Sequence, residues 1–191
     1  MSIKRALKVF LNFILSGYEI YKIFYINESP LITEIENNKL KFTEIHGEPT
    51  HLLNNYLYNK NIAYLGEGSR AFVCLENDNV IGFCVYWHGE RYLKRNFFPL
   101  GDKEAKLVHI ETLQNMRGKG VASNLIRYSS GEMFEHGFKS LYARIWHSNT
   151  PSIKSFNNAG WKYLTTIVTA RSKLFGSIKI RLKPFKIMKR D

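Results

Sequence analysis

The chain has 191 residues, of which 45% are hydrophobic and 23% charged, a balance that fits one globular domain and excludes collagen-like, low-complexity and disordered chains. Its net charge of +12 comes from the two ends, because residues 26 to 170 carry 16 Lys and Arg against 14 Asp and Glu. Residues 171 to 191 carry eight basic side chains against one acidic one. Such ends suit either a polyanionic partner or a solvated tail, and both interpretations stay open.

The first predicted element is an amphipathic helix over residues 3 to 15. Asn12, Glu19 and Lys22 interrupt the apolar stretch, which excludes a membrane-spanning helix, and residues 16 to 18 make a poor signal-peptidase site. We therefore expect residues 1 to 17 to form an appendage that packs on the domain or adsorbs to an anionic membrane surface. The apolar side chains that recur at helical spacing are Ile3, Leu7, Phe10, Leu11 and Ile14.

The remaining elements alternate between strand-like and helix-like patterns. In chain order the patterns predict a strand at 18 to 26, a helix at 49 to 59, a hairpin of 71 to 75 with 80 to 87, a strand at 106 to 113, a helix at 118 to 137, a strand at 141 to 146, a helix at 150 to 160, and a strand pair at 161 to 168 and 175 to 182. This order predicts an α/β fold in which a mixed sheet carries helices on its faces.

The two cysteines, Cys74 and Cys84, both lie in apolar strand-like runs. We expect two free buried thiols in a reducing compartment, which indicates a cytoplasmic protein. No Cys or His spacing in the chain is typical of a zinc site, so no metal is expected.

The strongest local signal is the run Arg117-Gly118-Lys119-Gly120-Val121-Ala122 between a predicted strand and a predicted helix. Two close glycines let the backbone approach a phosphate, and successive N–H groups at a helix start form an anion site. The spacing is neither that of a P-loop nor that of a Rossmann fingerprint. By itself the run is better explained as a basic turn that enters a helix.

A second segment, Asn149 to Trp161, places an Asn before a helix and a Gly-Trp pair after it. Together the two segments resemble the GNAT superfamily of N-acetyltransferases. The resemblance implies a mostly antiparallel sheet with a splayed strand pair at the cofactor site and helices on both faces. It places the acyltransferase domain at residues 18 to 182, followed by a basic tail at 183 to 191.

The resemblance also implies acetyl-CoA as co-substrate, with its pyrophosphate on the backbone N–H groups of the glycine run. Many relatives carry a Tyr general acid where this chain has Phe156, so either Ser155, Tyr142, Tyr163 or water replaces it, or the thiolate leaves without a general acid. The residues that the resemblance assigns to the cofactor are Thr112, Leu113, Arg117, Gly118, Lys119, Gly120, Val121, Ala122, Asn149 and Phe156.

The candidate catalytic residues are His109 and Glu111, which strand alternation places on the same face. Either could deprotonate an amine directly or through a water. Glu111 is favoured because members of the family often carry an acid near this position. An ordinary ion pair for Glu111 and a core position for His109 remain equally good interpretations.

The function expected from the resemblance is transfer of an acetyl group to a primary amine of a small molecule. Three alternatives stay open: an acyl carrier protein as donor, a non-catalytic acyl-CoA-binding module, and attachment to the inner membrane surface. A homodimer is also compatible with the family. Nucleic acid is disfavoured, because few aromatic residues interleave with the basic tail. The basic, aromatic connection at residues 89 to 104 is either a lid that selects the acceptor or a surface loop.

Overall fold

The structure is a computed structural model that describes residues 15 to 30, 39 to 45, 52, 55 to 94, 99 to 172 and 176 to 182. The predicted basic tail at 183 to 191 lies outside the described residues, as do residues 1 to 14 of the predicted N-terminal helix. The last three residues assigned to that appendage, 15 to 17, belong instead to the first strand.

Eight strands and four α-helices make up the described fold. The strands are β1 (Leu15–Ile26), β2 (Leu40–Ile45), β3 (Ser69–Glu76), β4 (Asn79–Trp87), β5 (Glu104–Thr112), β6 (Ser140–Trp146), β7 (Lys162–Ser172) and β8 (Gly176–Leu182). The helices are α2 (Tyr56–Asn61), α3 (Gly89–Leu93), α4 (Val121–Glu135) and α5 (Thr150–Asn158), with 3-10 turns η2 (Ile62–Tyr64) and η3 (Gln114–Met116). None of the helices in this described part is long and apolar enough to span a membrane.

The predicted elements are present, with shifted ends. The helix predicted at 49 to 59 is observed as α2 from Tyr56, where the side chain of Asn55 caps it by accepting the N–H groups of Leu57 and Tyr58. Residues 49 to 51, 53 and 54 of the predicted helix lie outside the described residues. The connection at 89 to 104, predicted without regular structure, opens with α3. The other predicted strands and helices differ from the observed ones by a few residues at each end.

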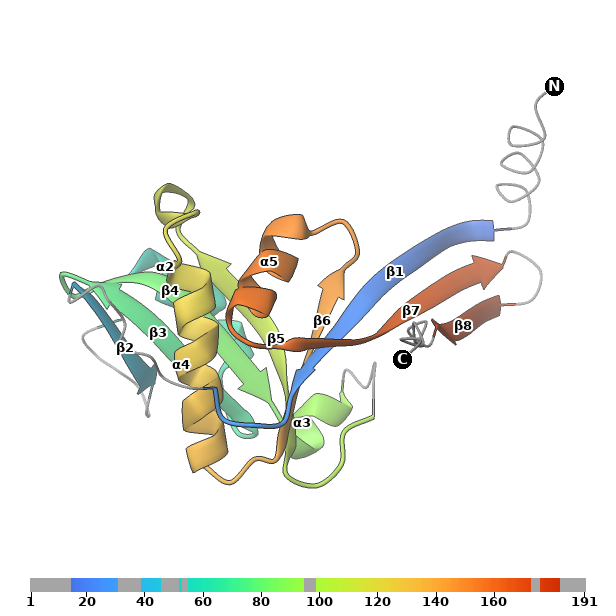
Figure 1. Ribbon diagram of the computed structural model, residues 1–191, viewed down its shortest axis with the longest axis horizontal. Coiled ribbons are helices and arrows are strands. Elements are labelled where there is room, and N and C mark those ends of the chain that lie inside the picture. The colour runs from blue at the N-terminus through green and yellow to red at the C-terminus, as the bar shows by residue number, and fades with distance from the viewer. Residues whose placement is uncertain are drawn as a thin grey trace, which may run out of the picture.

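One sheet holds all eight strands in the order β2-β3-β4-β5-β6-β1-β7-β8. Every neighbouring pair is antiparallel except β5 and β6, which run parallel. The strand at the start of the chain, β1, lies between β6 and β7. The long strands β1 and β7 extend together with β8 to one side of the helices (Figure 1). The predicted mixed, mostly antiparallel sheet is confirmed.

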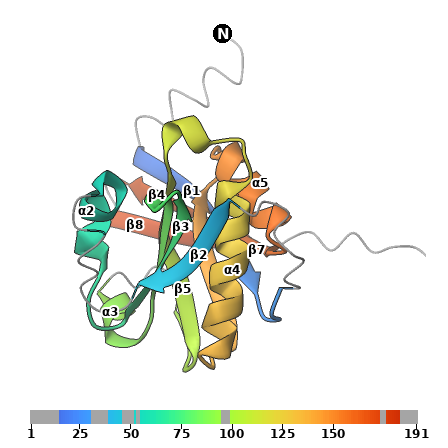
Figure 2. The same ribbon diagram turned by 90° about the vertical axis from the view of Figure 1, so that its left-hand side faces the viewer.

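Helices cover both faces of the sheet, as predicted. Figure 2 shows α2 and α3 on one side of the strands and α4 and α5 on the other. Alternate residues of β3 belong to two separate hydrophobic cores. Phe72 and Cys74 pack in the core under α4 and α5, and Ala71 and Val73 pack in the core under α2 and α3. This alternation explains why β3 and β4 read as continuous apolar runs, since both of their faces are buried.

The parallel pair β5–β6 is the irregular point of the sheet. Its register covers only Glu104 to Leu107 of β5 against Ser140 to Ala143 of β6. Beyond these residues β5 continues to Thr112 and β6 to Trp146 without pairing to each other. The two strands therefore part toward their carboxyl ends, which confirms the predicted splay.

Both cysteines are free and buried. Burial raises the pKa of the Cys74 thiol and of the Cys84 thiol to about 12 in each case, and a nearby Glu76 adds to the effect at Cys74. Thiols with such pKa values stay protonated at neutral pH and act as small apolar groups.

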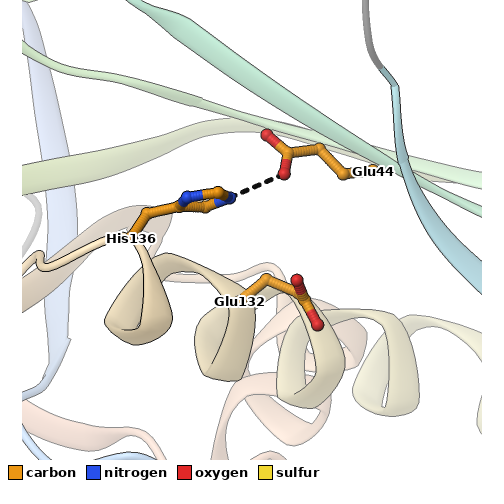
Figure 3. A group of neighbouring side chains, drawn as sticks. All are labelled: Glu44, Glu132 and His136. Carbon is orange, nitrogen blue, oxygen red and sulfur yellow. Dashed lines mark hydrogen bonds and ion pairs between the residues drawn. The ribbon is translucent and has the colours of Figure 1, made fainter.

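An ion-pair cluster ties β2 to the carboxyl end of α4 (Figure 3). The Glu44 side chain, only 7% exposed, pairs through Oε1 with Arg70 Nη1 at 2.6 Å and through Oε2 with His136 Nε2 at 2.8 Å. Ligand atoms of Glu44, Glu132 and His136 lie within 4.8 Å of one another. The Glu44–His136 contact brings two of these three groups together, and Glu132 lies one helical turn before His136.

We predict that Glu44→Ala lowers the free energy of unfolding by about 1–3 kcal/mol, because it leaves the partly buried charge of Arg70 without this partner. The matched control is Glu19→Ala, which removes the Arg171–Glu19 pair, whose side chains are 64% and 36% exposed. Exposed pairs contribute at most about 1 kcal/mol. Urea unfolding of both variants checks the prediction, and equal losses would contradict it.

Candidate active site

A cavity of about 500 Å³ opens between the carboxyl half of β5 and the first turns of α4 and α5. It therefore lies where β5 has left β6, so the parting of the strands creates the space. Its lining comes from three separate stretches of chain: Ile110, Glu111 and Thr112; Met116, Arg117, Gly118, Gly120, Val121, Ala122, Ser123 and Ile126; and Asn149, Pro151, Ser152, Lys154, Ser155 and Asn158.

The glycine run forms a tight turn into α4. Gly118 and Gly120 both have φ of +80°, a left-handed conformation that side-chain-bearing residues adopt only with strain. A Cβ on Gly118 would meet nothing within 4 Å, so the backbone at this turn is open to a ligand. No side chain caps the N terminus of α4. Its first N–H groups can therefore bind an anion, which the helix dipole favours.

The start of α5 borders the same cavity. Asn149 caps this helix, because its Oδ1 accepts the N–H of Ser152 at 3.2 Å, and Pro151 fits the first turn because it needs no N–H partner there. Two helix N termini thus face one cavity, with Arg117 and Lys154 on its wall. This concentration of positive potential suits a ligand with several phosphates.

The Thr112 side chain supplies a further sign of a ligand site. Its hydroxyl is buried, and within the described part of the chain it has no hydrogen-bond partner. Buried hydroxyls are rarely left without a partner. Since Thr112 also lines the cavity, a bound molecule can supply that partner.

Seven of the ten residues assigned to the cofactor line this cavity: Thr112, Arg117, Gly118, Gly120, Val121, Ala122 and Asn149. Three do not. Leu113 donates its N–H to the Ile81 carbonyl at 3.0 Å, and its side chain packs on both cores. Lys119 places Nζ 3.7 Å from Met116 Sδ.

The third, Phe156, is buried in the core with 2% exposure. Its ring packs against Phe24 and Trp161, with centroids 6.2 and 5.0 Å away. It therefore holds α5 on the sheet rather than facing the cavity.

Among the substitutes for a Tyr general acid, only Ser155 lines the cavity. Its hydroxyl donates to the Pro151 carbonyl at 3.1 Å. Tyr142 binds Glu104 at 3.0 Å, at the opposite end of β5, and the exposed Tyr163 pairs its hydroxyl with Thr166 at 2.7 Å. Neither tyrosine lies on the cavity wall.

Glu111 lies on the cavity wall and is held by two residues of α2. Lys60 Nζ lies 2.5 Å from its Oε1, and Asn61 Nδ2 donates to its Oε2 at 3.3 Å. Partial burial acts to raise the pKa of Glu111, but the hydrogen bonds from Lys60 and Asn61 outweigh it, so the pKa lies below its ordinary value. The carboxylate is therefore ionised at neutral pH.

His109 lies on the same side of β5 as Glu111, as the alternation predicts. Its Nε2 is 3.6 Å from Glu111 Oε2, and its ring stacks on Tyr64 with centroids 4.5 Å apart. Unlike Glu111, it does not line the cavity. This separation places the imidazole beside the Glu111 carboxylate but is too long for a hydrogen bond between them.

The sequence analysis missed Lys60 and Asn61. They precede Glu111 by 51 and 50 residues, and no motif marks them. A contact over this separation leaves no local pattern in the sequence of α2.

Of the two alternatives for residues 89 to 104, the described residues favour the surface loop over a lid on this cavity, because none of them lines it. This connection leads into the amino end of β5, whereas the cavity lies at its carboxyl end. Its neighbours His88 and Phe138 meet edge to face with centroids 5.1 Å apart, and its described residues line a different cavity of about 490 Å³ beside the carboxyl end of α4. None of these described residues borders the cavity at the glycine run.

Comparisons with known proteins agree with this geometry. Residues 32 to 161 match the sequence model of the Acetyltransferase (GNAT) family. No curated protein is similar enough in sequence to count as a relative.

Solved structures share the fold at low identity. A GCN5-related N-acetyltransferase from Sphaerobacter thermophilus aligns over 96% of this chain and 58% of its own, with 12% identity and a TM-score of 0.56. A GNAT-family protein from Novosphingobium aromaticivorans aligns over 82% and 65%, with 12% identity and a TM-score of 0.54. A tandem GNAT protein of the clavulanic acid pathway aligns over 88% and 58%, with 11% identity and a TM-score of 0.54.

This chain thus spans less than two thirds of the length of these three structures. The family match covers more than half of the chain, including the glycine run and the start of α5. The chain therefore belongs to the GNAT family of acetyltransferases.

Proposed function

We propose that the chain transfers an acetyl group from acetyl-CoA to the primary amine of a small-molecule acceptor. The observation that supports this most is the cavity where β5 and β6 part. The N termini of α4 and α5 border it, and the glycine run lines it. Acetyl-CoA carries phosphates that suit the helix N termini and a long polar arm that suits the exposed edge of β5. The buried hydroxyl of Thr112 gains a partner in this arrangement.

The residues then divide into two groups. Backbone N–H groups from Gly118 to Ala122 hold the pyrophosphate, with Arg117 and Lys154 adding positive charge. Glu111 and its α2 partners lie on the acceptor side of the cavity. Acetyl-CoA supplies the activated thioester whose carbonyl the amine attacks.

Glu111 acts on the acceptor amine. Its ionised carboxylate attracts the ammonium form, and it accepts the departing proton directly or through a water. Because its pKa is lowered, Glu111 stays ionised at neutral pH, so its own titration does not limit the rate there. The leaving thiolate is protonated by Ser155 or by water, since the buried Phe156 offers no proton.

A second candidate is an acyl-CoA-binding module without turnover. The buried Phe156 favours it, because this side chain has no proton to donate to a leaving thiolate. It differs from the first in one measurable respect. Such a module binds acetyl-CoA but releases no CoA thiol in the presence of any amine.

We predict that Gly120→Glu raises the Kd for acetyl-CoA at least about tenfold, a change of about 1.4 kcal/mol, because a carboxylate then stands in the phosphate turn. Gly137→Glu is the matched control: its φ is +82° against +80° for Gly120, and it lies at the other end of α4. Both variants carry the same charge change and a similar backbone strain of about 1–2 kcal/mol. Calorimetry should show weakened binding in Gly120→Glu alone, and equal Kd values for the two variants would refute the phosphate turn.

We predict that Glu111→Gln lowers kcat by about 10²- to 10⁴-fold and leaves the Kd for acetyl-CoA nearly unchanged. Glu135→Gln, at an exposed position near the end of α4, serves as control and should keep full activity. The assay is CoA release with a panel of primary amines. A Glu111→Gln enzyme that keeps wild-type kcat would exclude Glu111 from the reaction.

The lowered pKa of Glu111 also predicts the pH profile. The carboxylate is charged above its unfolded pKa of about 4.3 and loses its charge only as the pH falls through the lower folded value. We expect kcat/KM of the wild type to rise with pH through the acceptor's own pKa. An inflection near neutrality that vanishes in Glu111→Gln would contradict the assigned charge state.

A further inference from the structure

The ammonium group of Lys60 occupies an unusual position. Its Nζ lies 2.5 Å from Glu111 Oε1, on a carboxylate that lines the acetyl-CoA cavity, and its side chain is 47% exposed. Under the proposed function, the acceptor's ammonium would sit on this same carboxylate. We propose that Lys60 is itself an acceptor, and that the enzyme acetylates its own Lys60 when no external amine is present.

The carboxylate is fixed in place for this contact. Asn61 is 2% exposed, and its Nδ2 bonds both Glu111 Oε2 at 3.3 Å and the Leu57 carbonyl at 2.9 Å. The cap from Asn55 fixes the first turn of α2. Lys60 therefore extends from a capped helix to one oxygen of the Glu111 carboxylate, whose other oxygen is held by Asn61.

The position also distinguishes Lys60, which meets the cavity wall through Glu111, from Lys154, which lines the cavity itself. Lys154 lies on α5, beside the helix N termini that favour phosphates. Lys60 instead comes from α2, on the side of Glu111 where the proposed function places the acceptor. Only the second location puts an amine next to the proposed proton acceptor.

The reaction balances without any further reagent. Lys60 loses a proton to Glu111 or to a water beside it, and Nζ then attacks the thioester carbonyl. The new N–C bond forms as the C–S bond breaks, and the leaving thiolate takes up a proton. The products are an amide on Lys60 and free CoA thiol.

The charge state of Lys60 sets the expected rate. The hydrogen bond to Glu111 raises the pKa of Lys60 above its ordinary value, although partial burial opposes the shift. The neutral amine is therefore scarce near neutrality, so self-acetylation is slow and accelerates with pH. An external amine has to displace Lys60 from Glu111, so a good acceptor protects Lys60.

The test incubates the full chain with acetyl-CoA and no amine, followed by intact mass measurement and peptide mapping. We expect a mass gain of one acetyl group on Lys60, faster at about pH 9 than at about pH 7, as for an amine with a pKa above 10. Lys60→Arg and Gly120→Glu should gain nothing there. Lys162→Arg, which changes an exposed lysine on β7, should acetylate Lys60 as the wild type does.

Two outcomes would overturn the inference alone. One is acetyl-CoA binding by calorimetry with no acetyl group on Lys60. The other is acetylation spread over many lysines and unchanged in Gly120→Glu, which indicates uncatalysed transfer. The inference rests on the proposed function, so a wild-type chain that binds no acetyl-CoA would overturn both together.

Discussion

The early end of pairing between β5 and β6 is the feature on which the rest of the site depends. Parallel neighbours keep their register for four residue pairs and then part. The gap exposes the carboxyl half of β5, which supplies Glu111 and Thr112 to the cavity. It also leaves room for the N termini of α4 and α5, whose dipoles point into the same space. A sheet that stayed paired to the end of β5 would have no cavity here.

The two faces of the sheet contribute differently to this cavity. On one face α4 and α5 bring the glycine run and the cap of α5, which suit phosphates. On the other face α2 reaches β5 through Lys60 and Asn61 and controls the charge of Glu111. Under the proposed function, β5 therefore separates donor binding from amine handling, with Glu111 at the boundary between them.

Much of the fold could be predicted from the sequence, because apolar alternation and helix caps are local signals. The turn into α4 was predictable as well, because its left-handed positions are occupied by two glycines, Gly118 and Gly120, which are visible in the local sequence. The insertion of β1 between β6 and β7 was not, because nothing local in residues 15 to 26 specifies strands that lie more than 100 residues away. The Lys60–Glu111 pair escaped prediction likewise. The choice between a lid and a surface loop at residues 89 to 104 also depends on the direction of β5 relative to the cavity, which is a tertiary property.

The central claim, that acetyl-CoA lies at the splay between two helix N termini, is tested most directly by NMR. Backbone amide shifts would be followed in the full chain as acetyl-CoA is added. The account predicts that the largest changes fall on Gly118 to Ala122, on Asn149 to Ser152 and on Thr112. Changes concentrated instead around the second cavity, at Tyr92 and Phe138, or no changes at all, would contradict it.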